Sequence, residues 1–281
     1  MRPLSKYLSL SNEFWADIKF ISERSGYSKS KELIIPSIET IAAIYKKNKL
    51  DISKIVIGDH ITDYGQLLLS YLKDRAYGLN SLAPKLLMTK EEAKTEYEKL
   101  LPIRSYSCPQ PMNKQKGNKR AKSYFTCMIN MLIETEINSI PCNYDPKNLL
   151  IFTDQNKPFY VLSRRVDGAF PTIIDPISIW EIKEYYNTTT FGSRVADGIY
   201  ETLLDGLEIN EMQKVSNRKI FHYLSIDDFN TWWNMGKSYL CRIFDLIHMG
   251  LVDEVIFGRE IFKDIPRITK IWEEEYLIRN H

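Results

Sequence analysis

Two carboxylates and a lysine stand within one short stretch of the chain. Asp167 is followed, after thirteen intervening residues, by Glu181-Ile182-Lys183. Side chains alternate between the two faces of a β-strand, so a strand through this motif places Glu181 and Lys183 together on one face. Trp180 and Ile182 then lie on the opposite face and hold the strand against the hydrophobic core.

Carboxylates that converge favour a cation between them. Two such groups repel each other and raise each other's pKa unless a positive charge neutralises them. Magnesium takes one or two carboxylates together with water and phosphate oxygens. A neighbouring lysine can stabilise the charge that develops on a phosphate or orient an attacking water. These residue types therefore indicate metal-assisted phosphodiester hydrolysis with Mg2+ as the cofactor.

A turn at Asp175, directly before a proline, brings the two halves of the motif together. Pairing the strands about this turn places Glu181 nearer to Phe170 than to Asp167. We therefore expect the first strand to bend or bulge, which Gly168 permits. Asp175 is a rival for the first carboxylate, but its position before proline suits a turn residue better.

The elements around this motif alternate between strands and helices, which predicts an α/β fold. A strongly apolar helix is expected over 121–137, and two hairpins follow it before a helix over 192–207. A helix that ends at Gly250 is expected to begin at Asp227 or Asp228. The expected strands cover residues 148–153, 158–164, 166–174, 178–185, 219–226 and 252–257. A central mixed sheet flanked by helices accommodates this order.

The first hundred residues have mainly helical patterns, and the chain changes character at 102–117, where prolines and glycine predict a linker or long loop. This suggests a helical N-terminal region over 1–110 and a second domain over 111–281. The junction carries a basic cluster in which five of the ten residues 113–122 are basic. Its basic residues are Lys114, Lys116, Lys119, Arg120 and Lys122. We consider a phosphate-contacting arm and an ordinary solvated loop as alternatives.

The composition restricts the remaining possibilities. The 281 residues include 38 basic and 36 acidic side chains, so affinity for nucleic acid must come from local clusters of charge. The four cysteines and four histidines are scattered without metal-binding spacing, which argues against a zinc site or a disulfide framework. No segment has the roughly 20 apolar residues that a membrane span needs, and no signal-like start is present. We expect a cytosolic chain with no membrane partner.

The Asp167, Glu181-Ile182-Lys183 pattern resembles that of the PD-(D/E)xK nuclease superfamily. In this family an aspartate precedes a spacer and then Asp or Glu, an apolar residue and Lys. Val166 stands where the family pattern has proline. The family core runs helix, three strands, helix, strand, and the expected elements between 118 and 226 follow that order. The chain is most similar to a type II restriction endonuclease, which implies a restriction-endonuclease-like core.

The resemblance also implies roles for individual residues. Asp167, Glu181 and the backbone carbonyl of Ile182 would bind Mg2+, and Lys183 would act on the attacking water or the scissile phosphate. Many family members add a glutamate from the first core helix. Glu134 is the best placed candidate for this role, although a solvent-facing residue at a helix end is the alternative interpretation.

Several flanking residues are candidates for contacts with DNA. Thr189, Ser193 and Arg194 stand at the expected start of the helix after the catalytic strand, where hydroxyls and backbone amides suit a phosphate. A polar loop with a capping residue is the alternative. Arg164 and Arg165 precede the first carboxylate and either contact the DNA backbone or pair with a carboxylate.

These observations together predict an Mg2+-dependent endonuclease that cuts double-stranded DNA at a short specific sequence, as in restriction-type defence. A symmetric target would require a homodimer with one active site for each strand. The N-terminal region would take part in DNA recognition or dimerisation. Two alternatives remain open: a repair or recombination nuclease that recognises DNA structure, and a non-catalytic DNA-binding module built on the same core.

Overall fold

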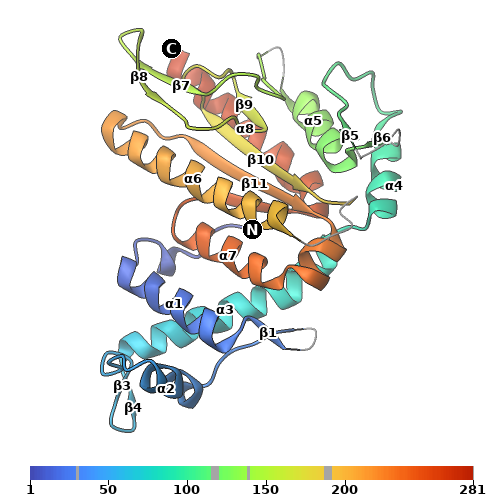
Figure 1. Cartoon of the computed structure of the whole chain (residues 1–281). Helices are drawn as coiled ribbons and strands as arrows, with labels where there is room; N and C mark the ends of the chain where they lie inside the picture. Colours follow the sequence, from blue (N-terminus) through green and yellow to red (C-terminus); the bar gives the residue numbers. More distant parts are fainter. Residues whose placement is uncertain (30–31, 115–119, 138–139, 187–191, 281) are drawn as a thin grey trace.

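A mixed four-stranded sheet forms the centre of the molecule (Figure 1). The computed structural model describes the chain except for residues 30–31, 115–119, 138–139, 187–191 and 281. The strand order is β12-β11-β10-β9. β9 (Gly168–Phe170) is antiparallel to β10 (Ser178–Glu184), whereas β11 (Phe221–Asp227) and β12 (Glu254–Phe257) run parallel to β10. The α/β class predicted from the sequence is therefore confirmed.

Helices cover both faces of this sheet, and its central strands are therefore buried on both sides. Parallel neighbours need crossover connections, and α6 (Ser193–Ser216) and α7 (Lys237–His248) provide them on one face. The other face packs against α5 (Tyr124–Glu136) and α8 (Ile261–Asn280). Helices and sheet form successive layers in Figure 1.

Stacked aromatic rings join β10 to α8. The rings of Trp180 and Trp272 lie 5.3 Å apart and nearly parallel, and Phe170 from β9 stacks on the same Trp272 at 5.5 Å. All three side chains are buried. The alternation predicted for β10 is therefore confirmed on this face, where Trp180 points into the core.

The first hundred residues form a 3-10 turn (Ser5–Tyr7) and four helices: α1 (Asn12–Ser25), α2 (Ile38–Lys47), α3 (Asp63–Leu86) and α4 (Lys90–Leu100). Each of these helices begins after a serine or threonine whose hydroxyl accepts a backbone amide, which satisfies a donor that the helix leaves open. Small hairpins connect them, namely β1 (Ser28–Lys29) with β2 (Glu32–Leu33) and β3 (Val56–Ile57) with β4 (His60–Ile61).

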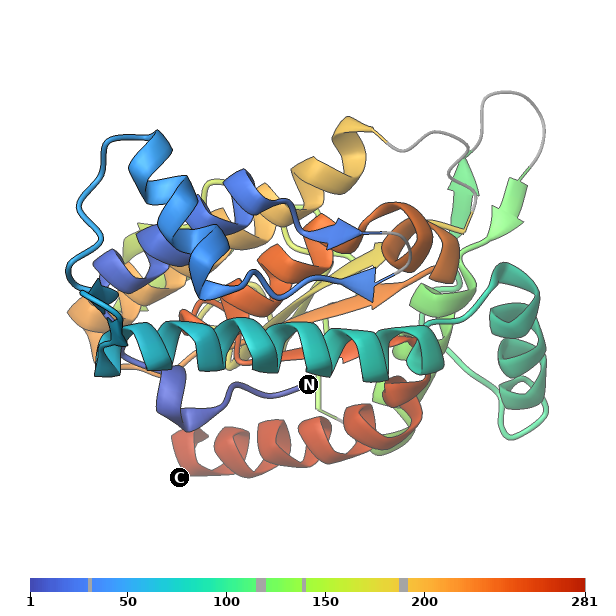
Figure 2. The ribbon, with the colours of Figure 1, turned by 90° about the horizontal axis from the view of Figure 1, so that it is seen from below.

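A buried ion pair ties these N-terminal helices to the sheet domain. Arg75 on α3 donates to Asp245 on α7 at 3.1 Å and to Ser22 on α1 at 2.7 Å. The Tyr71 hydroxyl donates to the same Asp245 carboxylate at 2.5 Å. One hydrophobic cluster also runs from α1 and α3 into α7. Figure 2 shows α3 passing in front of α7 and the strands.

Three expectations about the elements need correction. The strands expected over 148–153 and 158–164 exist as β7 (Ile151–Asp154) and β8 (Lys157–Val161), but they form a separate hairpin outside the central sheet. The expected loop at 102–117 contains β5 (Met112–Lys114), which pairs with β6 (Arg120–Lys122).

The expected helix ending at Gly250 is the third correction, because it is interrupted at Gly236. A π-helical turn (Asn230–Met235) precedes this glycine and α7 follows it. Asp228 accepts the backbone amide of Thr231 at 2.9 Å, so it caps the first of these segments, as the sequence predicted. A short 3-10 turn (Gly258–Glu260) leads from β12 into α8.

Replacing Trp272 with alanine should destabilise the protein by about 3–5 kcal/mol, because it leaves a cavity against Trp180 and Phe170. Chemical denaturation monitored by circular dichroism measures this loss. The matched control is Ile278→Ala on the same helix, where the side chain is 72% exposed and little change is expected. Equal effects of the two substitutions would contradict the role given to the aromatic stack.

Candidate active site

Asp167 and Glu181 lie directly across from each other at the edge of the β9–β10 pair. The register places Gly168 opposite Trp180, so the next pair outward is Asp167 and Glu181. The Asp167 amide donates to Glu181 Oε1 at 3.3 Å, and the Ile182 amide donates to Asp167 Oδ2 at 2.8 Å. The regular pairing ends at Gly168 and Trp180, and these two hydrogen bonds between side chain and backbone join Asp167 to the Glu181–Ile182 segment just beyond it.

The bulge expected at Gly168 is wrong. The chain reverses through residues 171–177 rather than in a tight turn at Asp175, and this longer connection shifts the register. Asp175 has a φ of 49° and accepts the Thr153 amide at 2.8 Å, so it is a turn residue as predicted. Gly168 has a different role: a Cβ there would lie 1.9 Å from the Trp180 indole.

Lys183 shares the face of Glu181, as strand alternation predicted. Its Nζ donates to Glu181 Oε2 at 2.7 Å. Glu181 is fully buried and Lys183 is almost so. This pair faces α6, on the side of the sheet opposite the Trp180 stack.

The helix α6 adds two acids that the sequence analysis missed. Glu201 accepts Lys183 Nζ at 2.8 Å, and the fully buried Asp205 accepts Arg164 Nη1 at 2.6 Å. The two acids are four residues apart, so they share one face of the helix. Gly198 lies on the same face, and a Cβ there would approach Lys183 Cδ to 3.2 Å, so the helix packs closely against the lysine.

Arg164 lies inside this group of acids. Its guanidinium contacts Glu181 Oε1 at 3.0 Å and Glu201 Oε2 at 3.3 Å, in addition to Asp205. Of the two interpretations made for Arg164 and Arg165, pairing with a carboxylate is the one observed for Arg164. Arg165 is exposed.

The site has an excess of negative charge. When all its groups are ionised, the acids Asp167, Glu181, Glu201 and Asp205 face two cations, Arg164 and Lys183, which leaves two negative charges.

The pKa shifts follow from this balance. Burial and the charge of Glu181 raise the pKa of Asp167 to about 6 and that of Asp205 to about 7. Burial acts in the same direction on Glu181, but Lys183 and Arg164 outweigh it and hold the pKa of that carboxyl below its usual value. Burial opposes the charge of Lys183, yet the adjacent acids, Glu181 first among them, raise its pKa. Asp167 and Asp205 are therefore the acids of this group that most readily take up a proton, which relieves the excess negative charge.

The donor set fits a hard divalent cation, since carboxylate oxygens are the ligands that Mg2+ prefers. Asp167 and Glu181 are the residues that could hold it. Within the described part of the chain, no three histidine, cysteine or acidic side chains are already grouped for a metal. Glu181 is turned toward Arg164 and Lys183 instead. The metal-ligand role of the Ile182 carbonyl stays a prediction.

Glu134 does not join this site. Its carboxylate accepts the Ser107 amide at 2.9 and 3.1 Å, near the end of α5. That helix packs on the sheet face that carries Trp180, whereas Glu181 faces α6. The sheet therefore separates Glu134 from the other predicted catalytic residues. The prediction that Glu134 joins the active site is wrong, because the sequence did not show which face of the sheet α5 would cover.

Besides Arg164 and Arg165, eight residues were predicted to contact DNA, and the five of them that the structure describes lie on the β5–β6 hairpin and on α6. Lys114, Arg120 and Lys122 belong to the β5–β6 hairpin, where Lys122 Nζ donates to the Gln110 carbonyl at 3.4 Å. Ser193 and Arg194 are exposed at the first turn of α6. The remaining three candidates, Lys116, Lys119 and Thr189, lie outside the described residues.

A polar hollow of about 770 Å³ opens beside the site. Two segments, 145–149 and 163–167, line it and bring Lys147, Arg164, Arg165 and Asp167 to its wall. Asp167 therefore faces an open polar space beside the site.

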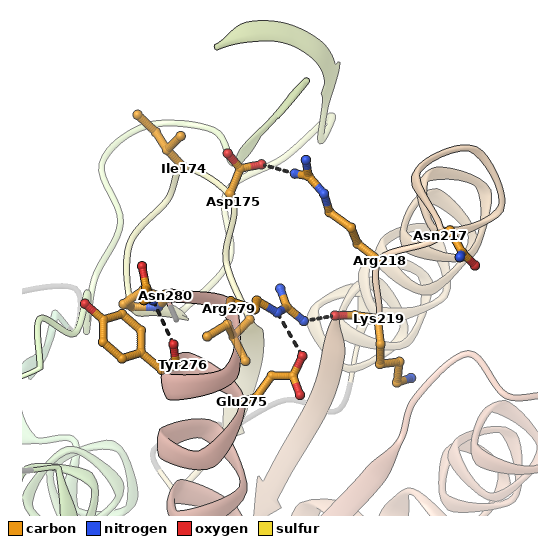
Figure 3. Close-up of a pocket in the computed structure, with 11 residues that line it drawn as sticks. Ile174, Asp175, Asn217, Arg218, Lys219, Glu275, Tyr276, Arg279 and Asn280 are labelled. Atoms are coloured by element: carbon orange, nitrogen blue, oxygen red, sulfur yellow. Dashed lines mark hydrogen bonds and ion pairs between the residues drawn. The ribbon is translucent and has the colours of Figure 1, made fainter. Parts of the chain in front are cut away.

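A second pocket, of about 720 Å³, lies apart from the site and shares none of its residues (Figure 3). Four of its charged side chains form two pairs. Arg218 donates to Asp175 at 3.0 Å, and Arg279 donates to Glu275 at 2.9 Å.

Two family models match the chain. One, described as a domain of unknown function (DUF7687), covers residues 88–272, and the other, also a domain of unknown function (DUF7690), covers residues 1–82. The two matches meet at the end of α3, whereas the sequence placed the boundary at residue 110. No curated protein and no solved structure matches the chain. No helix among the described residues is long and apolar enough to cross a membrane.

Asp205→Asn should flatten the pH dependence of stability. Burial and Glu181 raise the pKa of Asp205 from 3.8 to about 7, so the folded protein retains a proton that the unfolded chain releases. The stabilisation by this proton is complete below pH 3.8 and is lost as the pH rises to about 7. One proton contributes a slope of up to about 1.4 kcal/mol per pH unit.

Urea unfolding in EDTA at pH 5, 6 and 7 measures this slope. Asp197→Asn, at an exposed position of the same helix, is the control and should keep the wild-type slope. A wild-type slope in Asp205→Asn would show that Asp205 is ionised across this range.

Proposed function

The chain belongs to the DUF7687 family, and we propose that it is a magnesium-dependent endonuclease that hydrolyses double-stranded DNA at a specific short sequence. The observation that carries this proposal is the placement of Asp167 opposite Glu181, with Lys183 on the same face at 2.7 Å from Glu181. Two carboxylates that share a buried site, with a lysine beside them, form a costly arrangement. Metal-assisted hydrolysis of a phosphodiester uses these groups together, which accounts for the cost of burying them.

The order of elements supports the same proposal. Helix α5, the antiparallel β9–β10 pair, crossover helix α6 and parallel β11 follow one another along the chain. This agrees with the PD-(D/E)xK core that the motif implied, with one difference. The preceding hairpin β7–β8 is not part of the central sheet, although a bridge between Ile151 and Ile174 and a hydrogen bond from Thr153 to Asp175 join it to the chain before β10. A restriction-endonuclease-like core is therefore part of the proposal.

In this mechanism Asp167, which lines the polar hollow, and Glu181 beside it would hold Mg2+. When bound, the ion polarises the phosphate and lowers the pKa of a water molecule. Lys183 carries its positive charge at neutral pH and donates a proton in a hydrogen bond to the attacking water or to a phosphate oxygen. Glu201 holds Lys183 in place from α6 at 2.8 Å. Attack by water in line would leave a 5′-phosphate and a 3′-hydroxyl.

The surroundings of the hollow suit a DNA backbone. Lys147 and Arg165 lie on its wall next to Asp167, and both side chains are exposed. Ser193 and Arg194 at the start of α6 provide further donors. A palindromic target would be cut by a homodimer, with one site acting on each strand.

Asp167→Asn, Glu181→Gln and Lys183→Met should each reduce DNA cleavage by at least about 100-fold, the usual scale for removing a catalytic acid, base or electrostatic group. The substitutions keep side-chain volume, and far-UV circular dichroism checks that each variant is folded before its activity is compared. Cleavage of unmethylated phage DNA with Mg2+, and with EDTA in parallel, measures the effect. Lys214→Ala, exposed near the end of α6, is the control.

The pattern of products separates the proposal from its alternatives. Discrete bands that EDTA removes support a sequence-specific enzyme. A uniform smear supports a nuclease without sequence preference, and cutting of branched DNA alone supports a structure-specific repair enzyme. Salt-sensitive binding without cleavage of either substrate would favour a non-catalytic DNA-binding module.

Arg165→Ala should weaken binding to all DNA sequences by a similar factor. The slope of log affinity against log salt concentration should fall by about one, as expected for the loss of one phosphate contact. Fluorescence anisotropy of a labelled duplex in Ca2+, at several salt concentrations, provides the measurement. Lys270→Ala, exposed on α8 away from the hollow, loses the same charge and should bind like wild type. Identical behaviour of the two variants would remove Arg165 from the DNA path.

A further inference from the structure

Arg164 connects three carboxylates that come from two elements. Its guanidinium lies 3.0 Å from Glu181 on β10, 3.3 Å from Glu201 and 2.6 Å from Asp205, both on α6. Its side chain is only 22% exposed. An arginine stays protonated throughout the accessible pH range, so this positive charge is permanent.

The arginine provides the charge that Glu181 would otherwise take from a metal ion. Glu181 is fully buried, and both of its oxygens are engaged: Oε1 by Arg164 and Oε2 by Lys183. A buried carboxylate without such partners is strongly disfavoured. The Arg164 guanidinium and a divalent cation bound by Glu181 would therefore need the same carboxylate oxygens.

Asp205 is placed to retain the arginine independently of Glu181. Asp205 is fully buried, and it accepts the shortest of the three ion pairs that Arg164 makes. Its second oxygen, Oδ1, is buried without a hydrogen-bond partner. Asp205 therefore has a second oxygen available to accept a hydrogen bond from the same guanidinium.

We propose that Arg164 is a positioning residue that competes with the divalent metal for Glu181, with Asp205 as its anchor. The pairing keeps Glu181 oriented and its charge balanced when no metal is bound. When the metal takes Glu181, Arg164 stays on Asp205 and Glu201, at the wall of the hollow beside Asp167. This inference rests on the proposed function, because competition requires a metal site.

Isothermal titration calorimetry of the DNA-free full-length protein with Mn2+ tests the competition without relying on activity. Arg164→Gln should bind Mn2+ at least about fivefold more tightly than wild type, the lower end of typical coupling between sites. Arg164→Lys, which retains the charge but not the fork that reaches several carboxylates, should lie between them. Melting in EDTA checks that each variant is folded.

Arg165→Gln is the matched control, since it removes the same charge from the adjacent, exposed position. Tighter binding by Arg164→Gln with wild-type binding by Arg165→Gln supports the proposal. Equal or weaker binding by Arg164→Gln, or an equal gain in Arg165→Gln, overturns it and leaves the metal site standing. Absence of Mn2+ binding by wild type and by both variants overturns the metal-dependent function itself, and the competition with it. If Arg164→Gln does not fold, Arg164→Lys decides by the same criteria.

Discussion

The burial of one carboxylate determines how the rest of the site is arranged. Glu181 lies in the middle of β10 and has no exposed surface, so its charge must be balanced by groups that are themselves mostly buried. Lys183 and Arg164 supply that balance. Those two cations then need further acids, which Glu201 and Asp205 provide from α6. Balancing these charges therefore requires that β10, the segment before β9 and the crossover helix α6 lie together at this point.

Close packing on both faces of β10 makes this meeting possible. A Cβ at Gly168 would overlap the Trp180 indole, and one at Gly198 would lie 2.8 Å from the Tyr185 hydroxyl and close to Lys183. Without side chains at these positions, β9 and α6 approach β10 closely. On the opposite face Trp180 stacks on Trp272. An aromatic contact and an ionic network thus hold the same strand from its two sides.

The regions matched by the two family models share one core. Arg75 and Asp245 form a buried ion pair between α3 and α7. At the junction itself, the Met88 amide donates to Asp227 at 2.7 Å, at the end of β11. Burial raises the pKa of Asp227 to about 8, and the Tyr186 hydroxyl donates to the same carboxylate. The N-terminal helices are therefore attached to the strand next to the one that carries the site.

Local sequence determined the elements and the face of the strand that carries the motif. The helix start at Asp228, the alternation around Glu181 and Lys183, and the α/β class were predicted correctly, because they depend on neighbours within a few residues. The register that brings Asp167 opposite Glu181 was not predicted, since it depends on the path of residues 171–177.

Tertiary structure alone decided which distant acids complete the site. Glu134 and Glu201 are both glutamates on helices that adjoin the sheet, and their local sequences do not distinguish their roles. α5 packs on the aromatic face and α6 on the charged face, so Glu201 reaches Lys183 and Glu134 binds Ser107. Strand periodicity shows which residues share a face, but which helix covers that face is determined by the packing of the whole chain.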